Sequence, residues 1–249
     1  MTAPHVLVTG GSRGIGAATC RLAAARGWAV SVNYRAERAA AEAVAEAITA
    51  AGGRAAVAAG DVAVETEVTA MFDAAEGALG PVTAVVANAG IAAPSARLAD
   101  MDPARIRRVI DVNVTGALLT AREAARRMSR SRGGAGGAIV LVSSAAATLG
   151  GGGTYVDYAA SKGAIDVLTL GLGRELGPEG IRVNGVRPGM IETAIHAVIG
   201  DPERAARLGP TTPLGRAGTP EEVAEAIVWL MSDAASYVNA AMLDVTAGR

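Results

Sequence analysis

Tyr158 and Lys162 stand four residues apart and form the most chemically distinctive pair in this sequence. Lys162 is the only lysine, whereas the other 22 basic residues are arginine. On a helix, residues i and i+4 share a face, so the ammonium of Lys162 is expected beside the phenol of Tyr158. A positive charge there lowers the pKa of a tyrosine from its ordinary value of about 10. The pair predicts a proton donor or acceptor that works near neutral pH, beside a compact ammonium that arginine does not replace.

A glycine-rich segment lies between the first predicted strand and the helix that follows it. Gly10, Gly14 and Gly16 have the spacing Gly-x3-Gly-x-Gly. Glycines permit a tight turn and a close approach of the main chain, and free N–H groups at a helix N-terminus bind a pyrophosphate. We therefore predict a dinucleotide-binding loop. Its residues are Gly10, Ser12, Arg13, Gly14, Ile15 and Gly16.

The end of the second predicted strand carries Asn33, Tyr34 and Arg35. In dinucleotide-binding folds an acidic residue at this place binds a ribose 2′-hydroxyl, and an arginine binds a 2′-phosphate. Arg35 and Arg13 together can hold a phosphate by charge-assisted hydrogen bonds. The favoured cofactor is therefore NADP, with NAD as the alternative if both are ordinary surface arginines.

Short β-rich runs alternate with longer helical patterns along the whole chain. This alternation predicts parallel strands joined by right-handed crossovers, and hence a single α/β domain over residues 1–249, a doubly wound parallel sheet with helices on both faces. A length of 249 residues, 51% of them apolar, suits one domain with a large core. The strands are expected at residues 6–9, 29–34, 55–59, 82–87, 139–142, 182–186 and 242–245. The helices are expected up to about residue 26 and at residues 37–51, 65–79, 103–129, 155–176 and 221–231.

Composition argues against several other functions. A net charge of −1 gives no general attraction to nucleic acid, and the arginines at 122–132 have the spacing of a solvated helix face. Cys20 is the only cysteine, and His5 and His196 are the only histidines, so neither a metal site nor an intrachain disulfide is expected. Residues 1–5 lack the features of a leader, and no run of 18 apolar residues occurs. We expect a cytoplasmic protein without membrane or nucleic-acid partners.

Together these motifs resemble the short-chain dehydrogenase/reductase family from residue 6 nearly to residue 249. The family's TGxxxGxG is matched by residues 9–16, its YxxxK pair by Tyr158 and Lys162, and its structural and catalytic asparagine by Asn113. The resemblance implies a Rossmann fold in which Tyr158 is the proton donor, Lys162 also holds ribose hydroxyls, and a serine polarises the carbonyl. It assigns further cofactor contacts to Asp61, Val62, Asn88, Ala89, Gly90, Tyr158, Lys162, Pro188, Gly189, Ile191 and Thr193.

Two adjacent serines, Ser143 and Ser144, compete for the carbonyl-polarising role. Family precedent favours the second of such a pair, although its interval to Tyr158 is one residue longer here, and we place the extra residue in the glycine-rich loop at 150–153. We therefore choose Ser144. Tyr155 is a rival to Tyr158, but position 159 is alanine, so Tyr155 has no lysine at i+4 and is expected to line the substrate cleft.

The sequence departs from the family pattern at two places. Ala87 replaces the first asparagine of the NNAG turn, and Asn239-Ala240 stands where the family has Thr-Gly. The second change removes a glycine where the chain is expected to pass near the cofactor. This change puts in question how the C-terminal segment fits against the cofactor. It does not affect the predicted catalytic residues.

These features predict an NADP(H)-dependent carbonyl reductase or alcohol dehydrogenase. Its catalytic residues would be Asn113, which positions a relay water, Ser144, Tyr158 and Lys162. Residues 190–216 are the expected substrate lid. The sequence does not decide between two classes of small-molecule substrate. One is 3-oxoacyl thioesters, and the alternative is sugars or polyols, which would be the substrates of an NAD-linked enzyme. The alternatives from another class are a dinucleotide-sensing binding protein without turnover and a structural scaffold.

An assembly is also expected. The predicted helices at 103–129 and 155–176 carry apolar residues on more than one side, which exceeds what one sheet contact requires. The resemblance implies a homo-oligomer, most often a tetramer, in which these helices pair between subunits. The residues concerned are Leu118, Leu119, Val167, Leu168 and Leu172.

Overall fold

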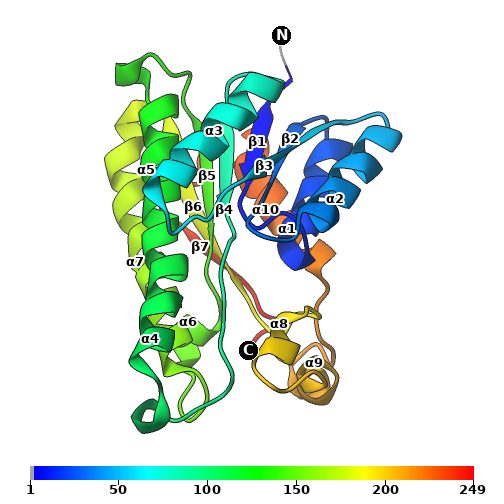
Figure 1. The fold of residues 1–249 in the computed structure, drawn as a ribbon, viewed down its shortest axis with the longest axis vertical. Helices are drawn as coiled ribbons and strands as arrows, with labels where there is room; N and C mark the ends of the chain where they lie inside the picture. Colours follow the sequence, from blue (N-terminus) through cyan, green and yellow to red (C-terminus); the bar gives the residue numbers. More distant parts are fainter. Residues whose placement is uncertain (1–2) are drawn as a thin grey trace.

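The computed structural model describes residues 3–249, and a seven-stranded sheet forms its centre. The strand order is β3-β2-β1-β4-β5-β6-β7, and every neighbouring pair is parallel. Figure 1 shows the sheet between two groups of helices. The predicted doubly wound parallel sheet is confirmed. The strands are β1 (His5–Val8), β2 (Ala29–Tyr34), β3 (Arg54–Ala59), β4 (Ala84–Ala87), β5 (Gly137–Val142), β6 (Ile181–Pro188) and β7 (Met242–Val245).

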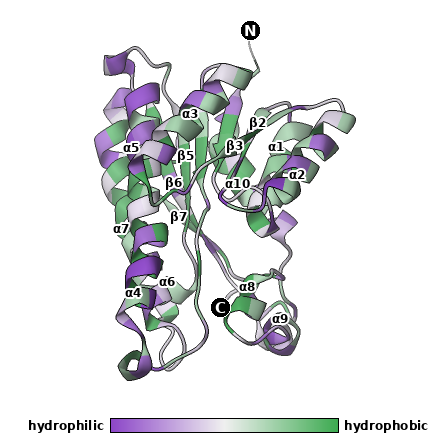
Figure 2. Cartoon of the chain, viewed as in Figure 1, coloured by the Kyte–Doolittle hydropathy of each residue, from purple (hydrophilic) through white to green (hydrophobic). Residues whose placement is uncertain are grey.

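Helices cover both faces of the sheet, so its central strands are buried on both sides and read as continuous apolar runs. The helices are α1 (Gly14–Ala25), α2 (Arg38–Ala50), α3 (Glu65–Leu79), α4 (Pro103–Ile110), α5 (Gly116–Met128), α6 (Ala146–Leu149), α7 (Val156–Leu176), α8 (Ile195–Val198), α9 (Arg204–Leu208) and α10 (Pro220–Met231). Val6 and Val8 of β1 point into a first core against α1, α2 and α10, whereas Leu7 points into a second core against α3, α5 and α7. Figure 2 shows hydrophobic residues concentrated on the strands between the helices.

The helix predicted over residues 103–129 is interrupted at one turn. α4 ends at Ile110, a π turn spans Asp111–Thr115, and α5 begins at Gly116, whose N–H donates to the carbonyl of Asp111. The wider turn contains Asn113, whose side chain is hydrogen-bonded to Ile91 and Ser161, outside this helix. A hydrophobic pattern does not reveal such a turn, because buried apolar residues occur on both sides of it, at Val109 and at Ala117.

The carboxyl ends of β1 and β4 meet where the strand order reverses, which is where ligands bind in sheets of this type. Figure 1 shows α6, α8 and α9 at this same end of the sheet. The segment 190–216 contains α8 and α9 and is tied by a parallel bridge between Ile191 and Gly218. Among the described helices, none is long and apolar enough to cross a membrane. Residues 1 and 2, which belong to the opening segment considered above, lie outside the described residues.

Candidate active site

Two asparagines hold the glycine loop that follows β1. The N–H of Gly10 donates to Asn33 Oδ1 at 3.1 Å, and Asn33 Nδ2 donates to the carbonyl of Ala58 at 3.0 Å. From the end of β4, Asn88 Nδ2 donates to the carbonyls of Thr9 and Gly10 at 2.9 and 3.2 Å. Both asparagines were predicted to contact a cofactor, and in the structure their side chains fix the shape of the loop.

The loop has the shape and chemistry that a dinucleotide pyrophosphate requires. Gly10 and Gly14 have φ values of 62° and 53°, which favour glycine. A Cβ on Gly16 would lie 2.3 Å from the carbonyl oxygen of Gly10, so no side chain fits there. No side chain caps α1 at Arg13 within the described chain, so the N–H groups of the first turn face outward at the positive end of the helix. These residues fit a nicotinamide dinucleotide held through its pyrophosphate.

Asp61 lies in a cluster of charges after β3. Its carboxylate accepts hydrogen bonds from the N–H of Ala63 at 3.0 Å and from Arg108 at 2.9 Å, and Arg35 Nη1 lies 3.6 Å from it. Burial disfavours the charge, but the hydrogen bonds from Ala63 and Arg108 outweigh it and hold the pKa of Asp61 below its ordinary value. The side chain of Arg35 is still 62% exposed, and Arg13 is exposed as well. Both guanidiniums are accessible beside the glycine loop.

Two other predicted cofactor contacts are placed in the interior. Tyr34 is 8% exposed and packs in the first core, because β2 is buried on both faces as far as its last residue. Val62 is also buried, and a Cβ on Gly116 would lie 2.6 Å from its Cγ2. The side chain of Tyr34 therefore lies in the core, and that of Val62 packs against the start of α5.

The two serines at the end of β5 have different surroundings. Ser143 is buried and donates to Asp166 Oδ1 at 2.6 Å and to the carbonyl of Lys162 at 3.0 Å, so it ties β5 to α7. Ser144 Oγ accepts a hydrogen bond from the N–H of Ala146 at 3.1 Å, and its side chain lies close enough to Tyr158 to lower the pKa of the phenol. Of the pair, Ser144 is the serine that the structure brings to Tyr158.

Tyr158 lies in the first turn of α7 and is half-buried. Burial raises the pKa of Tyr158 to about 12, while the neighbouring side chain of Ser144 acts in the opposite direction. The ring of Tyr155 packs edge-on against that of Tyr158, with 5.8 Å between the ring centres. The phenol therefore keeps its proton at neutral pH.

Lys162 lies beneath the same site and is 4% exposed. Its Nζ lies 5.7 Å from the centre of the Tyr158 ring and donates to the carbonyl of Val142 at 2.7 Å. Burial lowers the pKa of Lys162 to about 8, against the attraction of Asp166. The predicted lowering of the Tyr158 pKa is thus not found in the protein alone. Desolvation of the phenol is the largest cause of its pKa shift, and the ammonium of Lys162 is directed at the main chain.

Asn113 joins three segments around the site. Its Oδ1 accepts from the N–H of Ile91 at 2.8 Å, and its Nδ2 donates to the carbonyl of Ile91 and to Ser161 Oγ, both at 2.9 Å. A Cβ on Gly90 would lie 3.3 Å from Lys162 Nζ and 3.4 Å from Asn113 Oδ1. Gly90 is therefore the point at which the loop after β4 meets Lys162 and Asn113.

The segment after β6 closes one side of the site. The N–H of Ala145 donates to the carbonyl of Pro188 at 2.9 Å, which joins the ends of β5 and β6. A Cβ on Gly189 would lie 2.6 Å from the main chain of Thr246. Ile191 is buried in the first core, and Thr193 Cγ2 would lie 3.6 Å from a Cβ on Gly14. The structure thus brings the start of the segment 190–216 to the glycine loop.

The C-terminal departure from the family pattern lies away from this site. Ala240 donates its N–H to the carbonyl of Val183 at 2.8 Å and lies against Gly173, in the last two turns of α7. The expectation that this position lies near the cofactor is therefore corrected. Ala240 does have a φ of 56°, a conformation that favours the glycine it replaces.

A buried ion pair that the sequence did not predict lies next to Tyr158. Arg105 of α4 donates from Nε and Nη2 to the two oxygens of Asp157 at 2.9 and 3.2 Å, and its Nη1 donates to the carbonyl of Pro94. The Asp157 side chain is 2% exposed and lies in the first turn of α7, where the helix dipole favours a negative charge. The sequence does place Asp157 next to Tyr158, so a charge near the site could have been predicted. Nothing in the sequence identifies Arg105 as the partner of Asp157.

The glycine loop at the reversal of strand order defines a dinucleotide-binding Rossmann protein. Residues 10–249 match the protein-family model described as enoyl-(acyl carrier protein) reductase. The chain is 51% identical to the uncharacterized oxidoreductase YgfF of Escherichia coli, with 98% of both chains covered. It is 43% identical to cis-4-hydroxycyclohexanecarboxylate dehydrogenase of Sinomonas cyclohexanicum, over 97% of this chain and 94% of that protein.

A solved structure of 3-ketoacyl-(acyl-carrier-protein) reductase from Brucella melitensis, complexed with NADH, superposes with a TM-score of 0.90 at 30% identity, with 100% of this chain and 98% of that chain covered. The chain belongs to the short-chain dehydrogenase/reductase family. It is an NAD(P)-dependent oxidoreductase of that family.

Proposed function

We propose that the protein is an NADP(H)-dependent carbonyl reductase or alcohol dehydrogenase in which Tyr158 is the general acid and base. The observation that carries the proposal is the position of Lys162 Nζ, 5.7 Å from the centre of the Tyr158 ring, with the side chain of Ser144 next to the phenol. Two neighbouring hydroxyl groups can both donate to one carbonyl oxygen. A bound nicotinamide dinucleotide supplies or accepts the hydride.

The residues around this pair have distinct proposed roles. Tyr158, whose raised pKa keeps the phenol protonated, donates a proton to the carbonyl oxygen during reduction and accepts it during oxidation. Ser144 donates to the same oxygen and stabilises its developing charge. Lys162 supplies a positive charge below the phenol and binds ribose hydroxyls, and Asn113 positions a relay water. Residues 190–216 act as the lid of a single catalytic domain formed by residues 1–249.

The reaction can be tested with purified protein and a panel of ketones and aldehydes. We expect consumption of NADPH, measured as loss of nicotinamide absorbance, that depends on both the carbonyl compound and Tyr158. Binding of NADPH without turnover of any compound would favour a dinucleotide-sensing protein. No binding at all would favour a scaffold and would contradict the proposal.

For the cofactor, we propose a preference for NADP over NAD. The support is that Arg13 and Arg35 are exposed beside the glycine loop, and that Arg35 has only a loose 3.6 Å contact with Asp61. One charge-assisted hydrogen bond contributes about 1.5–3 kcal/mol, so we expect kcat/KM for NADPH to exceed that for NADH by about tenfold or more. Arg35→Asp should remove the preference, and Arg21→Asp, a matched change on the exposed surface of α1, should not. Equal kcat/KM with both cofactors in the unmodified enzyme would contradict this assignment.

We also propose a homo-oligomer, assembled first across the outer faces of α5 and α7. Of the five apolar residues noted in the sequence, Leu119, Leu168 and Leu172 pack against the second core, whereas Leu118 and Val167 are 45% and 70% exposed. The two helices also enclose a groove of about 730 Å³ that lies away from Tyr158. The apolar positions that the core leaves uncovered are the ones a second copy of the chain would bury.

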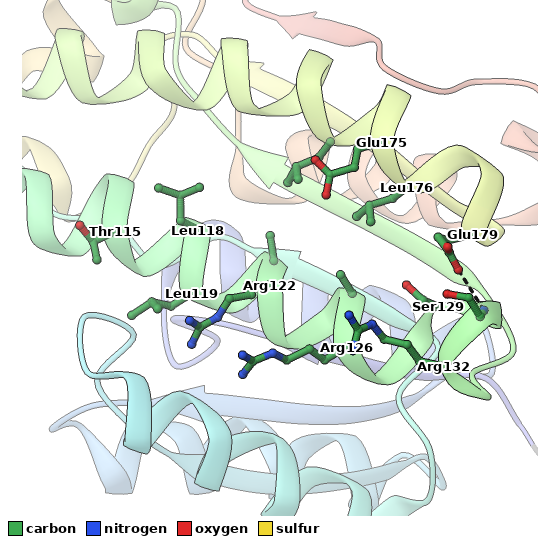
Figure 3. Close-up of a pocket in the computed structure, with 14 residues that line it drawn as sticks. Thr115, Leu118, Leu119, Arg122, Arg126, Ser129, Arg132, Glu175, Leu176 and Glu179 are labelled. Atoms are coloured by element: carbon green, nitrogen blue, oxygen red, sulfur yellow. Dashed lines mark hydrogen bonds between the residues drawn. The ribbon is translucent and has the colours of Figure 1, made fainter.

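The charges along this groove are complementary to those of a second copy of the same surface related by a two-fold axis. Figure 3 shows Arg122, Arg126 and Arg132 on the α5 side of the groove, and Glu175 and Glu179 on the side of α7 and the turn after it. In a two-fold interface each patch meets its own copy, so acidic and basic sides can face each other across the axis. The edge strand β7, on which Leu243 is exposed, would offer a second contact through which two such dimers form a tetramer.

Sedimentation or light scattering at micromolar concentration tests the assembly. We expect a mass above the 24.8 kDa of one chain. Val167→Glu, on the outer face of α7, should lower that mass, whereas Leu214→Glu, at a residue that is 69% exposed elsewhere, should not. A mass near 24.8 kDa for the unmodified protein would contradict the proposed assembly without bearing on the reaction.

A further inference from the structure

Arg204 of α9 lies close to the proposed proton donor, and no step of the proposed reaction uses it. Its Nη2 donates to the hydroxyl of Tyr155 at 3.1 Å, and its guanidinium carbon lies 5.5 Å from the centre of the Tyr155 ring. The Tyr155 ring in turn packs edge-on against Tyr158. The segment 190–216 thus places a cation one aromatic ring away from Tyr158.

The protein balances the charge of Arg204 only in part. Its acidic neighbour is Asp201, whose Oδ2 lies 3.7 Å from Arg204 Nη1. Arg207 holds the same oxygen more closely, so two guanidiniums share one carboxylate. The Arg204 side chain is 17% exposed, against 57% for Arg207. An anion that reaches Arg204 would therefore meet a partly desolvated cation, where a charge-assisted hydrogen bond is stronger than in water.

Contacts on both sides hold the segments that surround Arg204. On the α7 side, Gly151 allows the Tyr155 ring to pack closely, since a Cβ there would lie 2.7 Å from Tyr155 Cδ2. On the other side, Ser95 donates from both its N–H and its Oγ to the carbonyl of Ile199, each at 3.1 Å, and so ties the segment 190–216 to the loop after β4. The ring that Arg204 contacts and the segment that carries Arg204 are therefore both held by neighbouring elements.

We propose that Arg204, supported by Tyr155, selects substrates that carry a carboxylate about one ring width from the reacting carbonyl. This inference rests on the proposed carbonyl reduction at Tyr158. A planar carboxylate accepts two parallel hydrogen bonds from a guanidinium and also balances its charge. A neutral group of the same shape, such as a carboxamide, has only one acceptor oxygen and carries no charge. A contact that only held the segment 190–216 against α7 would affect charged and neutral substrates equally.

The test compares two substrates of nearly the same shape, 4-oxocyclohexanecarboxylate and 4-oxocyclohexanecarboxamide, with NADPH. In the unmodified enzyme we expect kcat/KM to be higher for the carboxylate by about tenfold or more, and Arg204→Leu should bring the ratio to about 1. Arg26→Leu is the matched control. It removes an exposed arginine, paired with Glu225, at the end of α1 far from the glycine loop, and it should leave the ratio unchanged.

Either a ratio of about 1 in the unmodified enzyme or an equal loss on both substrates in Arg204→Leu would overturn the inference. Binding of both compounds to the NADP+-loaded enzyme, measured by calorimetry, provides a readout that does not need turnover. Tighter binding of the carboxylate that is lost in Arg204→Leu supports the inference, and equal binding or no binding overturns it. Failure to reduce any carbonyl compound would instead count against the proposed reaction, while the calorimetry would still decide the role of Arg204.

Discussion

The ammonium of Lys162 donates a hydrogen bond to the main-chain carbonyl of Val142 at 2.7 Å, at the carboxyl end of β5. This bond fastens α7 to the sheet directly below Tyr158. It also directs the Nζ toward Gly90, where even a Cβ would lie 3.3 Å away. Lys162 therefore combines two requirements, a positive charge and a small head group in a narrow space.

Lys162→Arg should consequently reduce kcat/KM strongly, to well under half of the unmodified value, and weaken dinucleotide binding at the same time. A guanidinium is a planar fork that is wider than an ammonium, and it would displace the loop at Gly90. Steady-state kinetics and a dinucleotide titration measure the two effects. Arg174→Lys, an exchange between the same two residue types on the exposed face of α7, is the control and should change neither. Retention of more than about half of the rate by Lys162→Arg would show that charge alone is enough.

Tyr158→Phe should separate turnover from cofactor binding. The substitution removes only the hydroxyl that the proposed proton transfer uses, and general acid catalysis contributes typically about 10²–10⁴-fold. We expect kcat to fall by about that factor while the dissociation constant of NADPH stays within a few-fold of the unmodified value. If kcat were unchanged, the proton would come from another group, with Tyr155 as the first residue to examine.

The same substitution should change stability at alkaline pH. The pKa of Tyr158 is raised to about 12 in the folded chain, so the folded protein keeps this proton at pH values where the unfolded chain has lost it. The folded state therefore has its full stability below the pKa of Tyr158 in the unfolded chain, which is about 10. Part of the unfolding free energy is then lost as the pH rises toward 12. Relative to Tyr158→Phe, the unmodified protein should lose about 1 kcal/mol of unfolding free energy from about pH 9 to about pH 11. Urea unfolding of both proteins measures the difference, and a constant difference over this range would show that the pKa is not raised.

The sequence was sufficient to predict the fold class and the proximity of Tyr158 and Lys162, because both depend on local periodicity. It was not sufficient to predict the direction of the Tyr158 pKa shift. That direction depends on the burial of the phenol and on the carbonyl of Val142, which reaches Lys162 only because β5 lies beside α7. For the same reason Arg105 and Arg204 were missed as neighbours of the tyrosines: their partners lie 52 and 49 residues away along the chain.

Ala240 provides a prediction that concerns stability alone. Its φ of 56° lies in the left-handed region, which costs a residue with a Cβ about 1–2 kcal/mol, whereas glycine adopts it freely at a smaller entropic cost. Ala240→Gly should therefore raise the unfolding free energy by about 0.5–1 kcal/mol and leave kcat/KM unchanged, since the position lies against Gly173 and away from Tyr158. The neighbouring Ala241→Gly, at a position without a positive φ, should lower the unfolding free energy. If both substitutions destabilised the protein by the same amount in urea unfolding, the strain assigned to Ala240 would be absent.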